Sequence, residues 1–364
     1  MHRLSIIILI IFIISGCDKY ESDCNLSEVC SETITPTNIS LAYPNNFPSP
    51  NIPEWNPLTE EGVNLGRHLF YDPILSSDNT ISCASCHKQE YAFGDNAQFS
   101  VGVNQALGTR HSPTIMNVAF QEQFDWDGKS NSLEEQASRP IFNEIELHNN
   151  NWSEVINRLA MSDIYPDLFC AAFGTEEIDS LSIVMAISQF ERTLISSNSR
   201  FDQWLRGEVA FTSEELDGFN IFSSERGDCF HCHPTGLFTD NIFHNNGLDS
   251  DFTDMGRYDI TGNPLDKGLF KSPTLRNIEF SAPYMHDGRF NTLDEVIEHY
   301  NFGGYDSPTV DPLMKYIYTN PYNIPGLTGL LLTEEEKANL KAFLLTLSDP
   351  LFIENPNLSN PFND

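Results

Sequence analysis

Two short motifs constrain this chain more than any other feature. Residues 83–87 read Cys-Ala-Ser-Cys-His and residues 229–233 read Cys-Phe-His-Cys-His. A Cys-x-x-Cys-His pattern is typical of c-type haem attachment, because two thiols one turn apart reach the two vinyl groups of one porphyrin and the adjoining histidine lies under the iron. The sequence therefore predicts two covalent haem c groups, attached through Cys83, Cys86 and His87 and through Cys229, Cys232 and His233.

Two other roles are known for Cys-x-x-Cys pairs. Pairs of such units bind zinc, and a single unit can act as a thiol redox centre. Neither role requires a histidine directly after the second cysteine, whereas a histidine follows both pairs in this chain. Haem attachment is therefore the favoured interpretation of both motifs.

The N-terminus has the features of an export signal. A basic start precedes a run over residues 4–14 that is apolar apart from Ser5. Such a run is too short for a transmembrane helix and predicts a signal peptide. It ends in Ile-Ser-Gly-Cys, which resembles a bacterial lipoprotein box, so we expect residues 1–17 to direct lipidation of Cys17 on the periplasmic side of a membrane. The alternative is an ordinary signal peptide with a chance cysteine at this position.

The net charge of the chain bears on which class of macromolecule it binds. The chain has 52 acidic and 20 basic residues and a formal net charge of −32. This charge argues against a nucleic-acid partner. It suits attraction of a basic protein such as a small cytochrome, although a generic acidic surface explains it equally well.

Three further cysteines lie outside the haem motifs. Cys24 and Cys30 fall in a stretch over residues 18–50 that is rich in Ser, Thr, Pro and Asn and that we interpret as a tether. They are candidates for pairing with each other, since export permits disulfides. Cys170 has no evident partner, and we expect it to be a small buried apolar residue.

An internal duplication organises the chain. Residues 111–140 align without a gap with residues 271–300, and ten of the thirty positions are identical. We predict two related haem domains, residues 51–205 and 206–350, followed by a tail over residues 351–364.

Helix signals outnumber strand signals. Capping boxes, in which a Ser or Thr is followed three residues later by Glu, predict helices that begin after Ser132, Thr212, Thr292 and Thr333. Alternating strand patterns are scarce. The expected fold is mostly α-helical.

The differences between the copies suggest two unlike haem sites. Tyr300 shares the inward face of the 293–300 helix with three aliphatic residues, whereas the first copy has Pro140 at the same position. A phenol oxygen binds iron and proline does not. Gln136 places an amide where the second copy has Val296. One site therefore looks closed by a protein ligand and the other open and polar, unless Tyr300 is a core tyrosine and Gln136 faces solvent.

Longer motifs resemble one protein family over nearly all of the mature chain. The chain is similar to the bacterial dihaem cytochrome c peroxidase and MauG family. Besides the first haem motif, the likeness lies in Leu65–Asp72, Trp126–Gly128, Leu133–Gln136, Phe238–Asn241, Ser272–Asn277 and Pro283–Gly288. The resemblance implies tandem cytochrome c-like domains with the haems near the domain interface.

The resemblance also implies roles for single residues. The haem on His87 is expected to react with peroxide, and Gln136 and Glu146 match the family's distal residues, which handle protons as the O–O bond breaks. Trp126 matches the tryptophan that lies between the haems. The haem on His233 is expected to be six-coordinate and to exchange electrons with a partner.

Three positions depart from the family pattern. Many of its peroxidases cap the peroxidatic iron with a histidine where this chain has Val103, so we expect no need for reductive activation. The peroxidases ligate the second haem with methionine, but the matching position is Tyr300, as in MauG; Met285 is a second candidate ligand or else a core methionine. His111 replaces an asparagine at the family's interdomain calcium site.

The sequence therefore does not decide whether a calcium ion binds at that site. The backbone carbonyls of Ser281 and Pro283 are available to it, but calcium prefers oxygen to the imidazole of His111.

Three functions remain at this stage. The first is an oxidoreductase that reduces hydrogen peroxide to water with electrons from a small cytochrome or cupredoxin. The second is a MauG-like enzyme that uses peroxide to oxidise residues of a partner protein. The third is a passive dihaem electron carrier with both irons capped.

Overall fold

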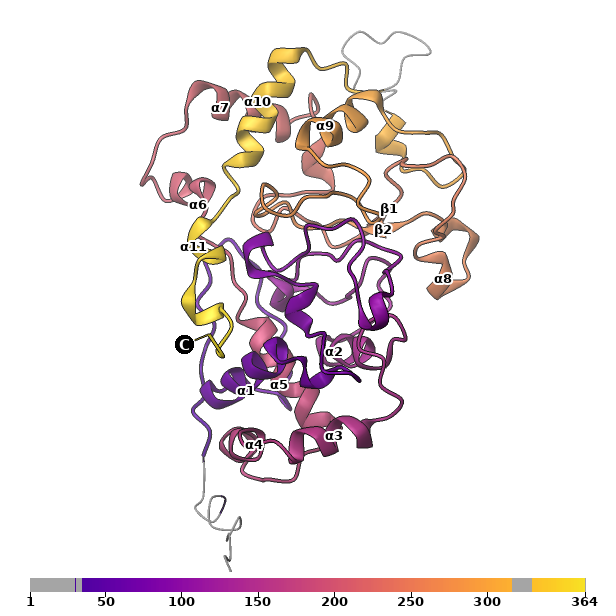
Figure 1. The fold of residues 1–364 in the computed structure, drawn as a ribbon. Coiled ribbons are helices and arrows are strands. Elements are labelled where there is room, and N and C mark those ends of the chain that lie inside the picture. Colours follow the sequence, from indigo (N-terminus) through magenta and orange to yellow (C-terminus); the bar gives the residue numbers. More distant parts are fainter. Residues whose placement is uncertain (1–29, 31–34, 316–328, 364) are drawn as a thin grey trace, which may run out of the picture.

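A computed structural model describes residues 30, 35–315 and 329–363 and is mostly helical, as predicted (Figure 1). Its helices are α1 (Glu60–Tyr71), α2 (Leu133–Phe142), α3 (Trp152–Ala160), α4 (Tyr165–Phe173), α5 (Ser180–Arg192), α6 (Arg200–Leu205), α7 (Ser213–Phe222), α8 (Tyr258–Thr261), α9 (Leu293–Phe302), α10 (Glu334–Leu345) and α11 (Pro350–Ile353). The short strands β1 (Phe243–His244) and β2 (Phe270–Lys271) pair antiparallel. No helix in these residues is long and apolar enough to cross a membrane. Cys17 lies outside the described residues.

The predicted helix starts are confirmed. Thr212, Thr292 and Thr333 each cap a helix in a reciprocal capping box, at the N-termini of α7, α9 and α10. At α2, the Ser132 side chain accepts a hydrogen bond from the backbone N–H of Glu135 at 3.1 Å. The Glu135 carboxylate turns instead to the backbone N–H of Asn131. The first copy therefore has the cap without the reciprocal bond.

Each half of the molecule contains a pair of helices that cross at a glycine. In the first half α1 packs on α5, and in the second half α7 packs on α10. A Cβ atom at Gly66 would overlap with the backbone carbonyl of Ala186, and one at Gly218 would overlap with that of Asn339. Only glycine permits either close approach. The same packing device occurs twice, as a duplication predicts.

The two halves meet through a reciprocal pair of backbone hydrogen bonds. The N–H of His111 donates to the carbonyl of His286 at 2.7 Å, and the N–H of Lys271 donates to the carbonyl of Trp126 at 2.8 Å. In the thirty-residue alignment, His111 corresponds to Lys271 and Trp126 corresponds to His286. The two bonds are therefore equivalent: each copy donates one to the matching position of the other copy. The copies are related by an approximate internal twofold axis.

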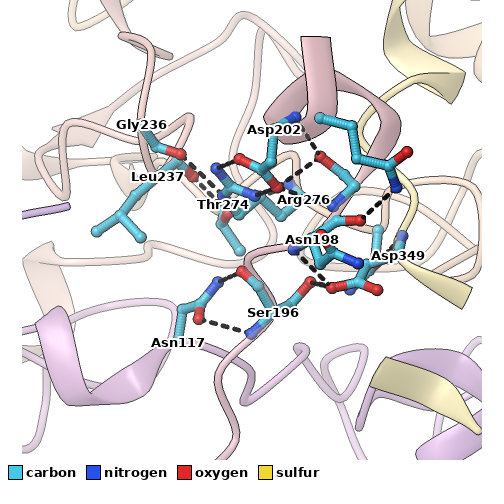
Figure 2. Close-up of polar contacts among 12 residues, drawn as sticks. Asn117, Ser196, Asn198, Asp202, Gly236, Leu237, Thr274, Arg276 and Asp349 are labelled. Carbon is cyan, nitrogen blue, oxygen red and sulfur yellow. Dashed lines mark hydrogen bonds and ion pairs between the residues drawn. The ribbon is translucent and has the colours of Figure 1, made fainter. Parts of the chain in front are cut away.

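Two equivalent asparagines extend this relation into a buried polar network. The Asn117 amide bonds the backbone N–H and carbonyl of Ser196 at 3.0 and 3.2 Å (Figure 2). Its counterpart Asn277 donates to the Ser196 hydroxyl at 2.9 Å and accepts from the backbone N–H of Asp349 at 2.6 Å. The segments that follow α5 and α10 are therefore joined at the domain interface.

Both ends of the described chain lie against the first half. In Figure 1 the yellow C-terminal segment returns beside α1, where the Arg67 guanidinium donates to the carbonyl of Ser359 at 2.6 Å. At the other end, the backbone N–H of Thr37 donates to Glu61 on α1 at 2.8 Å. Part of the expected tether is thus bound to the body of the protein.

A disulfide corrects the expected cysteine pairing. Cys30 is bonded to Cys170, which lies on α4, so pairing of Cys30 with Cys24 was wrong, and Cys170 is buried but not unpartnered. Cys24 lies outside the described residues. The N-terminal segment is held against α1, and α1 packs on α4. The packing of α1 on α4 brings together two cysteines that are 140 residues apart in the sequence. Local sequence patterns do not reveal such a pairing.

A fully buried ion pair anchors α6 to the second half. The Arg276 guanidinium donates two hydrogen bonds of 2.8 Å to Asp202 and a third to the carbonyl of Gly236 (Figure 2). It also lies 4.6 Å from the ring centroid of Phe47. The first copy has Met116 at the equivalent position, so this charge belongs to the second copy alone.

We predict that Arg276→Met lowers the free energy of unfolding by about 3–5 kcal/mol, because Asp202 would be left as a buried uncompensated charge. The matched control is Arg200→Met, since Arg200 pairs with Glu215 near the surface. Loss of such an exposed pair costs about 1 kcal/mol or less. Denaturant titration of the holoprotein measures both variants. Equal losses would contradict a special role for the buried pair.

Candidate active site

The two Cys-x-x-Cys-His motifs adopt the same local conformation. Cys83–Ser85 and Cys229–His231 each form one short 3-10 turn. The backbone N–H of His87 then donates to the carbonyl of Cys83, and that of His233 donates to the carbonyl of Cys229, both at 3.0 Å. None of the four motif cysteines forms a disulfide in the described structure. They are therefore available as thioether attachment points.

Both motif histidines are oriented for metal binding. His87 Nδ1 lies 3.0 Å from the carbonyl of Phe93, and His233 Nδ1 lies 2.9 Å from the carbonyl of Phe238. A proton on Nδ1 that donates to a carbonyl leaves the Nε2 lone pair free for a metal. Burial lowers the pKa of both imidazoles, which favours the neutral form that binds iron. The donor set of each motif fits one haem c.

The first cavity brings together the residues that the sequence assigned to peroxide chemistry, with Trp126 and Pro140 beside them. His87, Trp126, Gln136, Pro140 and Glu146 all line it. Gln136 and Pro140 lie one turn apart on one face of α2, as the periodicity predicts. Their catalytic roles stay predictions, but their convergence in one cavity is now established.

Val103 does not reach this cavity. Its side chain is 2% exposed and is absent from the cavity lining among the described residues. Its backbone N–H donates to the carbonyl of Glu146 at 3.1 Å, so its loop supports the segment that carries Glu146. An aliphatic side chain offers no atom to iron in any case.

The surroundings of Glu146 shift the pKa of its carboxyl upwards. Burial raises the pKa of its carboxyl, and the negative charge of Asp125 raises it further. One oxygen accepts a hydrogen bond from the Asn143 amide at 2.9 Å. A carboxyl whose pKa moves towards neutrality exchanges protons more effectively near pH 7.

The second cavity contains both candidate axial ligands. His233, Met285 and Tyr300 line it, together with the aliphatic face of α9. The Asn246 amide lies 3.4 Å from the Met285 sulfur and 3.5 Å from the Tyr300 oxygen, so the two candidates flank one group. Burial raises the pKa of Tyr300 to about 12. The choice between them stays a prediction.

Trp126 lies between the two cavities and lines both. Its indole N–H donates to the carbonyl of His111 at 2.8 Å, which holds the ring at the domain interface. The two copies of one tetrapeptide segment contribute most of the shared lining. Both cavities include His111, Pro113, Thr114, Lys271, Ser272, Pro273 and Thr274.

The calcium prediction is neither confirmed nor contradicted. His111 is buried and its Nδ1 lies 3.1 Å from the carbonyl of Ala97. Ser281 and Pro283 line the second cavity, as does His111. Calcium at this place stays a prediction.

Sequence reasoning missed Lys271 as a site residue. Lys271 lines both cavities, and its ammonium donates to the Gln121 side chain at 2.6 Å and to the carbonyl of Gln123 at 2.7 Å. Burial lowers the pKa of Lys271 to about 8. Its alignment with His111 was a usable signal, since both positions open the duplicated segment.

Comparison with known proteins identifies the family. The model of the di-haem cytochrome c peroxidase family matches residues 60–210. The methylamine utilization protein MauG of Methylorubrum extorquens is 37% identical over 311 residues, which cover 84% of each chain. The chain belongs to the di-haem cytochrome c peroxidase and MauG family. As the family implies, it is an oxidoreductase of the cytochrome-c peroxidase type with two haem c groups.

Other members span both branches of this family. The cytochrome c551 peroxidase of Nitrosomonas europaea is 36% identical over 70% of this chain and 76% of its own. A solved MauG-like protein associated with microbial copper homeostasis matches with a TM-score of 0.82 and 35% identity, over 89% of this chain and 99% of that one. Sequence similarity therefore establishes the family but does not decide between its peroxidase and MauG branches.

We predict that Tyr300 rather than Met285 ligates the second iron. A soft thioether prefers ferrous iron, so Tyr300→Met should raise the reduction potential of that haem and create the sulfur-to-iron absorption band of a Met-ligated ferric haem. Met285→Leu is the matched control and should leave the spectrum unchanged. A wild-type protein that already shows this band, and loses it in Met285→Leu, would make Met285 the ligand.

Proposed function

We propose that the protein reduces hydrogen peroxide to water with electrons from a small cytochrome or cupredoxin. The observation that carries this proposal is the lining of the first cavity. Gln136 and Glu146 lie there with His87, and neither Val103 nor Pro140 offers an iron ligand. An iron held by His87 would thus keep its other face accessible to peroxide.

The side chains of the first cavity divide the work of proton transfer. The haem supplies the redox chemistry of O–O cleavage, and the net change consumes one peroxide, two protons and two electrons to form two waters. Glu146 would accept a proton from the peroxide and return it to the oxygen that leaves as water, which is general acid–base catalysis. Gln136 holds the peroxide by hydrogen bonding. Trp126, at the wall of both cavities, provides a route for electrons.

A second candidate function is oxidation of residues in a partner protein. A tyrosine at position 300 of the second cavity favours it, because an anionic phenolate stabilises higher oxidation states of iron. The 37% identity to a MauG protein points the same way. A passive electron carrier is the least supported alternative, since it requires a protein ligand on the first iron.

The proposed partner and location rest on the net charge and on the N-terminal sequence. A net charge of −32 suits electrostatic attraction of a basic electron donor. Export to the periplasmic side, with a lipid on Cys17 as the membrane attachment, matches haem motifs and a disulfide that form outside the cytoplasm.

Steady-state assays with peroxide and a reduced small c-type cytochrome test the proposal. We predict turnover by wild type and a loss of at least tenfold in Glu146→Gln, because removing a general acid–base group typically costs about 10²–10⁴-fold. Glu144→Gln is the matched control, an exposed glutamate two residues away that should keep full activity. Both variants must retain two haems.

Two outcomes would contradict the proposal. Glu146→Gln as fast as wild type would make Glu146 a structural carboxylate. Rapid haem oxidation by peroxide without turnover of any reduced cytochrome or cupredoxin would favour the second function.

A further inference from the structure

Three side chains in or next to the second haem motif are neither haem attachment points nor the expected iron ligand. They are Glu225, Asp228 and His231, and their ligand atoms all lie within 4.8 Å of one another. His231 Nε2 is 3.1 Å from an Asp228 oxygen and 3.5 Å from a Glu225 oxygen. Glu225 and His231 are exposed and Asp228 is buried. Two carboxylates and one imidazole thus converge at the protein surface.

Asp228 is the member of this cluster that most needs a partner. Its side chain is fully buried, and neither of its oxygens accepts a hydrogen bond within the described part of the chain. His231 Nε2 lies 3.1 Å from one Asp228 oxygen, which makes an ion pair when the imidazole is protonated but lacks the geometry of a hydrogen bond. A buried carboxylate without donors is costly unless a cation compensates it.

Two of the three separations between the ligand atoms match coordination of one ion, and the third is no more than 4.8 Å. Zinc binds imidazole nitrogen and carboxylate oxygen at about 2.0–2.2 Å, so neighbouring ligand atoms around it lie roughly 3.0–3.5 Å apart. The two measured separations from His231 Nε2 fall in this range. One imidazole with two carboxylates suits Zn²⁺ or Cu²⁺, whereas Ca²⁺ and Mg²⁺ prefer all-oxygen sites.

The first copy provides an internal comparison. When the two haem motifs are superposed in sequence, Ser82 takes the place of Asp228 and Ser85 takes that of His231. The backbone N–H of Ser82 donates to the Ser85 hydroxyl at 3.0 Å. The first loop therefore satisfies its polar groups locally, and only the second loop presents metal ligands.

A neighbouring group of potential ligands is less suitable. Cys232, Asp240 and His244 also lie close together, but Cys232 is a haem attachment point. Both ring nitrogens of His244 are already engaged, with Asp311 at 2.7 Å and with Asp240 at 2.9 Å. The ring nitrogens of His244 therefore have partners without an ion.

We propose that Glu225, Asp228 and His231 bind one divalent transition-metal ion of the Zn²⁺ or Cu²⁺ class. Asp228 also lines the second cavity, so the ion lies next to the space of the second haem. The site shares no residue with the expected iron ligands or with the expected calcium site.

Metal titration of the tag-free dihaem holoprotein, treated first with a chelator, tests this site. Calorimetry with Zn²⁺ should detect one strong site per chain, and His231→Ala and Glu225→Gln should each weaken binding at least tenfold. His148→Ala, which removes another exposed histidine, is the matched control and should bind as wild type does. With Cu²⁺, the EPR spectrum should show nitrogen coupling that disappears in His231→Ala.

Wild-type protein without a saturable site would overturn the proposal, as would variants that keep the wild-type affinity. Haem content is measured for every variant, since His231 lies inside the haem motif. Glu225 lies outside it, so Glu225→Gln keeps the test decisive if His231→Ala loses a haem.

Discussion

The reciprocal hydrogen bonds between the two halves are the contact on which the arrangement of the site depends. The bond from His111 to His286 and the bond from Lys271 to Trp126 join equivalent segments across the internal twofold axis. These segments also wall both cavities, so the pairing brings the two haem sites to one interface. Because the His111 carbonyl also accepts from the Trp126 indole, the same contact positions the aromatic ring between the sites.

On this common scaffold the two copies have diverged in chemistry. Both halves have a helix crossing at a glycine, and in both halves the motif histidine contacts a phenylalanine carbonyl. The distal faces differ, since α2 presents Gln136 and Pro140 where α9 presents Val296 and Tyr300. We propose that these few substitutions on one helix face leave the first haem site open and close the second.

Local signals in the sequence predicted much of this molecule. Haem attachment and helix starts depend on residues within one or two turns, and the face that carries Tyr300 follows from helical periodicity. The bond between Cys30 and Cys170 was missed because it depends on the packing of α1 against α4. The amide of Asn246, placed between both candidate axial ligands, comes from a loop with no recognisable pattern. Tertiary contacts, rather than weak propensities, limited the prediction.

The EPR spectrum of the fully oxidised holoprotein tests the central claim most directly, because it counts the spin states of both irons in one sample. If the copies have diverged into an open and a closed site, the spectrum should contain one high-spin ferric haem, held by His87, and one low-spin ferric haem, held by His233, in equal amounts. Two low-spin signals, with no high-spin component, would mean that both irons are capped. That result would contradict the account and leave a passive electron carrier.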